Sequence, residues 1–156
     1  MYTMRLFVIS DSHGDLFTLK TVLSRATGFD TIIHLGDGAP DLLRLSEITY
    51  GKKIISVQGN CDNSAYGYPL TDTFFLDGQK IFCCHGHTYG VKFGLTRLSL
   101  AAAEQNAKLC LFGHTHQPFQ TRIDDVWFFN PGSVKNDCYG IVEAVKDKII
   151  PINLSL

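Results

Sequence analysis

Side chains that can bind metal ions follow five apolar runs of this sequence, each at the point where a run ends. The seven best suited to hold an ion are Asp11, His13, Asp37, Asn60, His85, His114 and His116. Side chains two positions apart in an extended segment point to the same side, so Asp11 with His13, and His114 with His116, can reach a common centre. Together with His87, which follows the same apolar run as His85, five of the six histidines lie at these run ends, which is not typical of scattered surface histidines.

The chemistry of these side chains points to more than one metal ion. Seven ligands exceed what one tetrahedral zinc uses, and a mixture of imidazole, carboxylate and amide suits Mn²⁺, Fe²⁺ or Zn²⁺. Two ions about 3.5–4 Å apart can share a carboxylate, clamp a phosphate and polarise a water molecule. Their charge outweighs that of Asp11 and Asp37, so the site would remain positive and favour an anionic substrate.

The elements that position these residues can be read from the hydrophobic pattern. Apolar runs predict strands over residues 6–9, 31–35, 54–57, 73–76, 80–84, 108–112, 119–123, 126–129, 139–145 and 148–153. Helical patterns begin at Leu16, with Asp15 as the cap and Gly28 near the end, and cover 41–47 and 99–106. The first half alternates strand and helix, which favours parallel strands.

The second half of the sequence is typical of antiparallel pairing. Asp77 and Gly78 are a two-residue hairpin signal of type I′, and further turn residues separate the last four runs. We therefore expect two packed sheets with helices outside them. Ligand sites in α/β proteins form at the carboxyl ends of strands, where five of these runs carry their polar residues.

Composition narrows the class of protein further. The 156 residues have a net charge of −1, from 14 basic and 15 acidic side chains, with no block of like charge. This predicts a single domain over 1–156 with no extended nucleic-acid surface and no membrane contact. No long apolar segment follows Met1, so we expect a cytoplasmic protein. The five cysteines lack C-x-x-C spacing and are expected to be reduced thiols.

The ordered motifs resemble a known family. They are D-S-H at 11–13, G-D at 36–37, G-N-C-D at 59–62, H-G-H at 85–87, G-H-T-H at 113–116 and N-P-G-S at 130–133. This series is similar to that of the calcineurin-like metallophosphoesterase family, in particular its small bacterial and archaeal phosphodiesterases. The resemblance implies an α/β fold that is a four-layer αββα sandwich, with two mixed β-sheets flanked by helices and a metal site at the C-terminal ends of strands.

The resemblance also implies roles for individual residues. Asp11, His13 and His116 would hold one metal, Asn60, His85 and His114 the other, and Asp37 would bridge them. A hydroxide between the two metals would attack phosphorus. Asn60 and His87 are the candidate catalytic residues, and Asn60, Cys61 and His114 would bind the substrate. Independently of the resemblance, His87 lies two positions after His85 and could face the same pocket as a phosphate contact or proton donor, with a purely structural hydrogen bond as the alternative.

Cys61 departs from the family pattern. Many relatives carry a histidine here that is placed to protonate the leaving oxygen, and a thiol is a poor substitute for it as an acid. Asp62 matches the acidic residue that orients this histidine, and we expect it to lack its usual partner. The departure favours phosphodiesters over phosphomonoesters.

Other residues have both a structural and a functional interpretation. His34 lies inside an apolar run and is expected to be a hydrogen-bonded core histidine. The turn at 130–133 is expected to be a plain turn, with support of the histidine ligands as the alternative. Tyr66, Tyr68 and Tyr89 follow the motifs and could stack on a leaving group, although exposed loop tyrosines are common.

The sequence therefore predicts a phosphodiesterase that uses two divalent ions per chain. Mn²⁺ is favoured, with Zn²⁺, Fe²⁺, Ni²⁺ and Mg²⁺ as alternatives, and the substrate would be a small phosphodiester, a nucleotide-derived one included. One alternative is a protein-interaction scaffold like the related subunit of the retromer coat, although such a scaffold is expected to have lost ligands and none of the seven is missing here. A phosphomonoesterase or protein phosphatase is another. A homo-oligomer is compatible with the sequence.

Overall fold

The computed structural model describes residues 4–156 and contains two five-stranded sheets. The first has the order β10-β9-β1-β2-β3 and the second the order β4-β5-β6-β8-β7. The strands are β1 (Met4–Ile9), β2 (Thr31–His34), β3 (Lys53–Ser56), β4 (Thr71–Leu76), β5 (Gln79–Cys84), β6 (Leu109–Leu111), β7 (Pro118–Ile123), β8 (Val126–Pro131), β9 (Cys138–Val145) and β10 (Lys148–Ser155).

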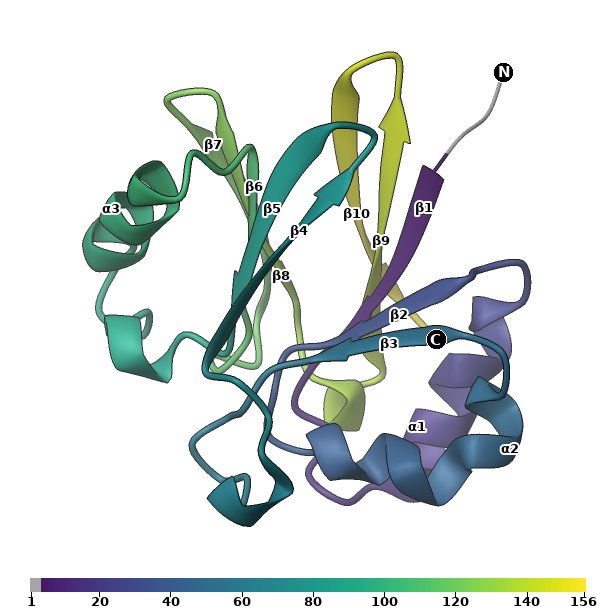
Figure 1. Ribbon diagram of the computed structural model, residues 1–156. Helices are drawn as coiled ribbons and strands as arrows, with labels where there is room; N and C mark the ends of the chain where they lie inside the picture. The colour runs from purple at the N-terminus through teal and green to yellow at the C-terminus, as the bar shows by residue number, and fades with distance from the viewer. Residues whose placement is uncertain (1–3) are drawn as a thin grey trace.

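Each sheet mixes parallel and antiparallel pairs, as the sequence predicts. In the first sheet β1, β2 and β3 are parallel, whereas β9 runs antiparallel to both β1 and β10. In the second sheet β6 is parallel to β5 and β8, and β4 and β7 add antiparallel edges. Helices α1 (Leu16–Leu23) and α2 (Ser46–Thr49) lie outside one sheet and α3 (Thr96–Glu104) outside the other (Figure 1). The predicted four-layer αββα sandwich is confirmed.

The central strands are apolar on both faces because each face packs against a different layer. In β1, Leu6 and Val8 belong to the core between the two sheets, whereas Phe7 and Ile9 pack toward α1. In β5, Ile81 and Cys83 likewise face the first sheet and the alternate residues face α3. Strands buried on both faces read as continuous apolar runs, which is why the sequence revealed them.

The helices differ from their predicted bounds in ways that local chemistry explains. Asp15 caps α1 by accepting from the Thr18 backbone N–H at 3.1 Å, as predicted, but α1 ends at Leu23 and a 3₁₀ turn over Ser24–Ala26 completes the segment. The helix predicted over 41–47 is mainly a 3₁₀ helix, η2 (Ala39–Leu45), followed by the single turn α2. The last helix begins three residues before the predicted position 99 and ends two before 106.

The predicted turn at Asp77-Gly78 and the predicted free cysteines are both confirmed. Asp77 and Gly78 both have positive φ, at 50° and 75°, as a type I′ turn requires. The five cysteines are free thiols. None of the helices between residues 4 and 156 has the length and apolarity needed to cross a membrane. The extent of the domain over 1–156 stays a prediction, since residues 1–3 lie outside the described part of the chain.

Candidate metal centre

The polar motifs meet at one end of the sandwich. The segments after β1, β2, β5 and β6 lie side by side there, below the strands in Figure 1. Backbone hydrogen bonds join them: Asp11 N–H donates to the Gly36 carbonyl at 2.9 Å, and Gly113 N–H donates to the His85 carbonyl at 2.9 Å. The convergence expected from the strand ends is therefore present, and it joins the two sheets.

A first group of side chains consists of Asp11, His13 and His116. One ligand atom from each lies within 4.8 Å of the others. The Nε2 atoms of the two histidines are 3.2 Å apart, and the Asp11 Oδ1 atom lies 3.1 Å from His116 Nε2 and 3.6 Å from His13 Nε2. These are the residues that the resemblance assigns to one metal.

A second group consists of Asp37, His85 and His114, whose ligand atoms also lie within 4.8 Å of one another. His85 Nδ1 is 2.7 Å from the Leu35 carbonyl oxygen, so this nitrogen carries the proton and donates it to the carbonyl. The other ring nitrogen, Nε2, is left to face Asp37 Oδ2 at 3.2 Å and His114 Nδ1 at 3.2 Å. A hydrogen bond of this kind sets the tautomer that a metal ligand needs.

The two groups have the chemistry of cation-binding sites. Asp11 is fully buried, and its Oδ1 atom makes no hydrogen bond although ring nitrogens surround it. Within residues 4–156, the ion-pair partners of Asp11 and Asp37 are histidines rather than lysines or arginines. Burying two carboxylates without a fixed positive charge is costly, and divalent ions would supply that charge. The donor set thus fits the metals implied by the sequence.

The backbone of these motifs is strained. Five candidate ligands adopt left-handed conformations: Asp11 (φ 56°), His13 (φ 47°), Asp37 (φ 56°), His114 (φ 71°) and His116 (φ 62°). The left-handed region costs a non-glycine residue about 1–2 kcal/mol. Strain of this kind clusters at functional sites, where the surrounding structure maintains it.

Asp62 is one residue whose role the sequence interpretation missed. Its carboxylate accepts hydrogen bonds from the backbone N–H groups of Asp37 (2.9 Å), Gly38 (2.8 Å) and Gly59 (2.8 Å). Asp62 thus ties the loop after β2 to the loop after β3, although the histidine that it would orient in the family is replaced by Cys61. Cys61 N–H adds a bond of 2.7 Å to Asp37 Oδ1.

His34 is fully buried beneath the first motif, as expected for a core histidine. Its Nδ1 atom accepts from Gly36 N–H at 3.1 Å, so Nε2 carries the proton and donates to the Ser12 hydroxyl at 2.9 Å. Ser12 in turn donates to Asp41 Oδ2 at 2.7 Å. This series of hydrogen bonds holds the segment between Asp11 and His13, and Asp41 is a second supporting residue that no sequence motif indicated.

The turn at 130–133 supports the metal centre rather than being a plain turn. The buried Asn130 amide donates to the Gly113 carbonyl and to the Thr115 hydroxyl, both at 3.0 Å. Ser133 Oγ donates to the Asp11 carbonyl at 2.8 Å. The preferred interpretation as a simple turn was therefore wrong, and the N-P-G-S motif was the signal for the alternative.

The electrostatics of the metal-free centre follow from burial and close charges. Burial acts to raise the pKa of Asp37, but its interactions with His85 and the Cys61 N–H prevail and lower it. Burial alone would lower the pKa of His85. The hydrogen bond with Asp37 and the negative charges of Asp11 and Asp37 have the larger effect, so the pKa is raised. For His114, burial and then the charges of His85 and Lys92 lower the pKa to about 4.

Three predicted site residues surround the two groups. Cys61 is exposed, and desolvation followed by the charge of Asp37 raises the pKa of its thiol, which therefore stays protonated at neutral pH. The amide of Asn60 lies 3.4 Å from Cys61 Sγ. The ring of His87 is 5.4 Å from that of His85, and burial and the charge of His85 lower its pKa. Its Nδ1 atom is buried without a hydrogen-bond partner.

Comparison with known proteins decides the family. The model of the calcineurin-like phosphoesterase superfamily domain matches residues 4–146, which include all the motifs. The chain belongs to the calcineurin-like phosphoesterase superfamily. Phosphodiesterase YfcE of Escherichia coli strain K12 is 32% identical over 155 residues, covering 84% of this chain and 79% of that protein.

Other members of the superfamily show what the fold can support. A structure of a conserved protein from Streptococcus pneumoniae, described as a predicted phosphoesterase, has a TM-score of 0.82 and 33% identity, covering 99% of this chain and 91% of that one. Vacuolar protein sorting-associated protein 29 of Schizosaccharomyces pombe is 33% identical over 126 residues, covering 77% of this chain and 64% of that protein. This calcineurin-like chain is thus similar both to phosphoesterases and to a protein whose name refers to vacuolar protein sorting.

Proposed function

We propose that the protein is a phosphodiesterase that uses two divalent ions per chain, with Mn²⁺ as the favoured metal. The observation that carries the proposal is the pair of side-chain groups around the buried Asp11 Oδ1 atom, which makes no hydrogen bond. Two divalent ions held there would neutralise phosphate charge and lower the pKa of a water molecule between them enough for it to attack phosphorus.

The residues of the chain would share the work as follows. Asp11, His13 and His116 would hold one ion, and His85, His114 and Asn60 the other, with the buried Asp37 carboxylate facing both. Asn60 and His114 would also hold phosphate oxygens, and His87 would donate its N–H to a phosphate or leaving oxygen. Zn²⁺, Fe²⁺, Ni²⁺ and Mg²⁺ are the alternatives to Mn²⁺, and a cytoplasmic location and homo-oligomer formation remain expectations.

The presence of Cys61 favours phosphodiesters over phosphomonoesters as substrates. Its protonated thiol with a raised pKa releases a proton less readily than an imidazole, so the leaving group must be stable without strong acid assistance. A diester also brings less negative charge to the centre than a monoester dianion does. We therefore propose small phosphodiesters with good leaving groups as substrates.

The test starts from protein stripped with a chelator. Activity on bis(p-nitrophenyl) phosphate should be lost and should return with Mn²⁺, and elemental analysis should find two ions per chain. Asp37→Asn should abolish both activity and binding of the second ion, because the amide removes a charge that faces both groups. Asp30→Asn, which alters an exposed aspartate just before β2, is the matched control and should leave both unchanged.

Three results would overturn the proposal. A single tight ion with full activity would exclude the two-metal centre. Complete metal loading with no turnover of any diester would favour the scaffold interpretation, which the similarity to the yeast sorting protein motivates. Equal turnover by Asp37→Asn and the parent protein would identify a contaminating phosphatase as the source of activity.

A further inference from the structure

A cavity of about 430 Å³ opens directly beside the candidate metal centre. Its lining includes His13 and Asp37, one from each group described above, together with Cys61, and ligand atoms of these three residues also lie within 4.8 Å of one another. Tyr66 lines the same cavity. A phosphoester bound at the metal centre would therefore have room for one of its substituents between Cys61 and Tyr66.

Two carboxylates that line this cavity, those of Asp62 and Asp41, are already hydrogen-bonded within the protein. The Asp62 carboxylate accepts three backbone N–H groups, and Asp41 Oδ2 accepts from Ser12 and from the Gly14 N–H at 2.8 Å. Among the described residues that line the cavity, none is a lysine or an arginine. A substituent carrying a second phosphate would find no cation there, whereas a neutral one would not need any.

Tyr66 presents an aromatic ring to the cavity, and its side chain is 56% exposed. The ring is stacked on Tyr68, with centroids 6.2 Å apart and planes at 18°. The short 3₁₀ turn that carries Tyr66, Ser64–Tyr66, is capped by the Asn63 side chain, which accepts from Ala65 N–H at 2.9 Å. The ring position is thus set before any ligand binds.

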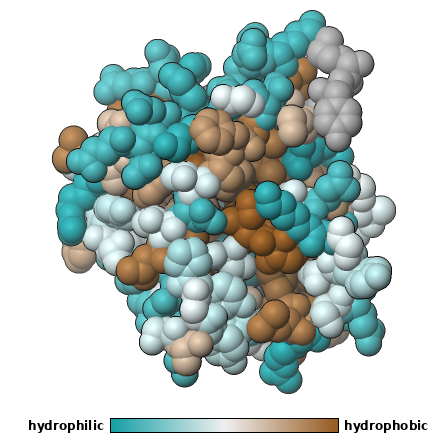
Figure 2. Space-filling model, viewed as in Figure 1, coloured by the Kyte–Doolittle hydropathy of each residue, from teal (hydrophilic) through white to brown (hydrophobic). Residues whose placement is uncertain are grey.

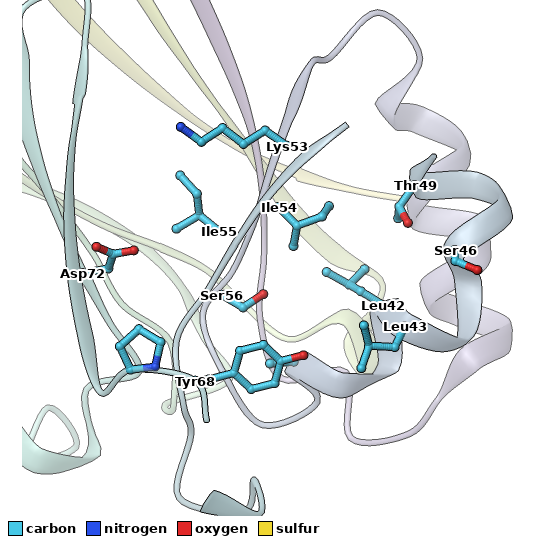
Figure 3. Close-up of a pocket in the computed structure, with 12 residues that line it drawn as sticks. Leu42, Leu43, Ser46, Thr49, Lys53, Ile54, Ile55, Ser56, Tyr68 and Asp72 are labelled. Carbon is cyan, nitrogen blue, oxygen red and sulfur yellow. The ribbon is translucent and has the colours of Figure 1, made fainter. Parts of the chain in front are cut away.

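Tyr68 also lines an apolar groove on the neighbouring surface. This groove of about 530 Å³ lies over β3 and η2, and Figure 2 shows it as a brown strip in the middle of the face. In the close-up of Figure 3, the ring of Tyr68 lies opposite Leu42 and Leu43. The next residue, Pro69, accepts from Gln58 N–H at 2.7 Å and ties this segment to the end of β3. The segment that carries the tyrosine pair is therefore anchored to the first sheet through Pro69.

We propose that Tyr66 is the stacking surface for the leaving group, and that the protein selects phosphodiesters whose leaving group is a neutral aromatic alcohol such as a phenol. The inference rests on the proposed function, and it adds the substrate class. Tyr89, the third tyrosine noted in the sequence, has a different role, because its ring packs edge-on against Phe82 at 6.2 Å in the core near α3.

The experiment separates aromatic stacking from leaving-group acidity. Two methyl phosphodiesters are compared, one with a substituted phenol and one with a fluorinated alcohol of the same acidity as leaving group. In the Mn²⁺-loaded parent protein, kcat/KM should be higher for the phenolic ester. Tyr66→Leu should lower this preference about tenfold, equivalent to about 1.4 kcal/mol and within the range measured for base stacking on aromatic residues.

Two further variants act as controls. Tyr66→Phe keeps the ring and should retain the preference. Tyr50→Leu alters a tyrosine that is 90% exposed at the end of α2 and does not line the cavity, so it should leave kcat/KM for both esters unchanged. An equal loss on both esters in Tyr66→Leu would overturn the stacking role.

A binding measurement keeps this inference distinct from the proposed function. Phenylphosphonate and cyclohexylphosphonate have a C–P bond that phosphoester hydrolysis does not cleave. Titration calorimetry of the metal-loaded protein should give tighter binding of phenylphosphonate, and Tyr66→Leu should remove the difference. If the parent hydrolyses neither ester, the proposed function fails, and the titration alone decides whether Tyr66 binds aromatic groups. Equal binding of both phosphonates by the parent would refute the inference.

Discussion

Replacing His34 by glutamine should make the stability of the protein less dependent on pH. His34 is fully buried, and its two ring nitrogens hold the Gly36 N–H and the Ser12 hydroxyl in an arrangement that requires the neutral ring. Burial lowers the pKa of His34 from 6.5 to about 4, and the charge of Asp11 only partly opposes this effect. The folded protein therefore resists protonation at a position where the unfolded chain accepts a proton.

The sign and the size of the effect follow from this difference in pKa. Well above pH 6.5, neither the folded nor the unfolded state binds a proton at His34. The contribution of the neutral ring to stability is then fully present. As the pH falls from 6.5 toward 4, the unfolded state takes up the proton first, so the folded state loses stability. With these pKa values, the loss between pH 7.5 and pH 5 is about 2 kcal/mol.

The assay is urea denaturation of chelator-treated protein at the two pH values. Glutamine can still donate an N–H to Ser12, but it does not titrate. We expect His34→Gln to be less stable than the parent at pH 7.5. On going to pH 5, its free energy of unfolding should fall by about 2 kcal/mol less than that of the parent. The other histidines titrate in both proteins and cancel in this comparison. Parallel pH profiles for the two proteins would refute the idea that His34 is held neutral.

Two further substitutions test the metal centre itself. Cys61→His should raise kcat/KM for an aryl monoester relative to the matched diester by about tenfold, because an imidazole supplies the acid that the thiol lacks. An unchanged ratio would leave His87 as the next candidate for the proton donor. Gly59→Ala should weaken binding of the second ion and destabilise the fold by about 1–3 kcal/mol, because the added methyl group would overlap Asp37. Gly51→Ala, where a Cβ meets nothing within 4 Å, should leave metal affinity unchanged when both variants are compared by titration calorimetry and denaturation.

The sequence alone was sufficient for the fold class and the family. The central strands are buried on both faces, so continuous apolar runs marked them, and Asp15 and the Asp77-Gly78 pair carried local signals for a cap and a turn. The candidate ligands could be recognised because they sit within short motifs at strand ends. Local chemistry determined these features, and local chemistry is visible in a sequence.

The tertiary structure decided the features that join distant segments. Asp62 binds backbone groups about 25 positions away, and Ser133 contacts Asp11 across more than 100 positions. The helix predicted over 41–47 became mainly 3₁₀ where the chain crosses beside the loop that Asp41 supports. Tyr66, Tyr68 and Tyr89 were equivalent in the sequence, yet only packing placed the first beside the metal centre and the last in the core. Such contacts depend on how the two sheets stack, and no spacing along the chain encodes that arrangement directly.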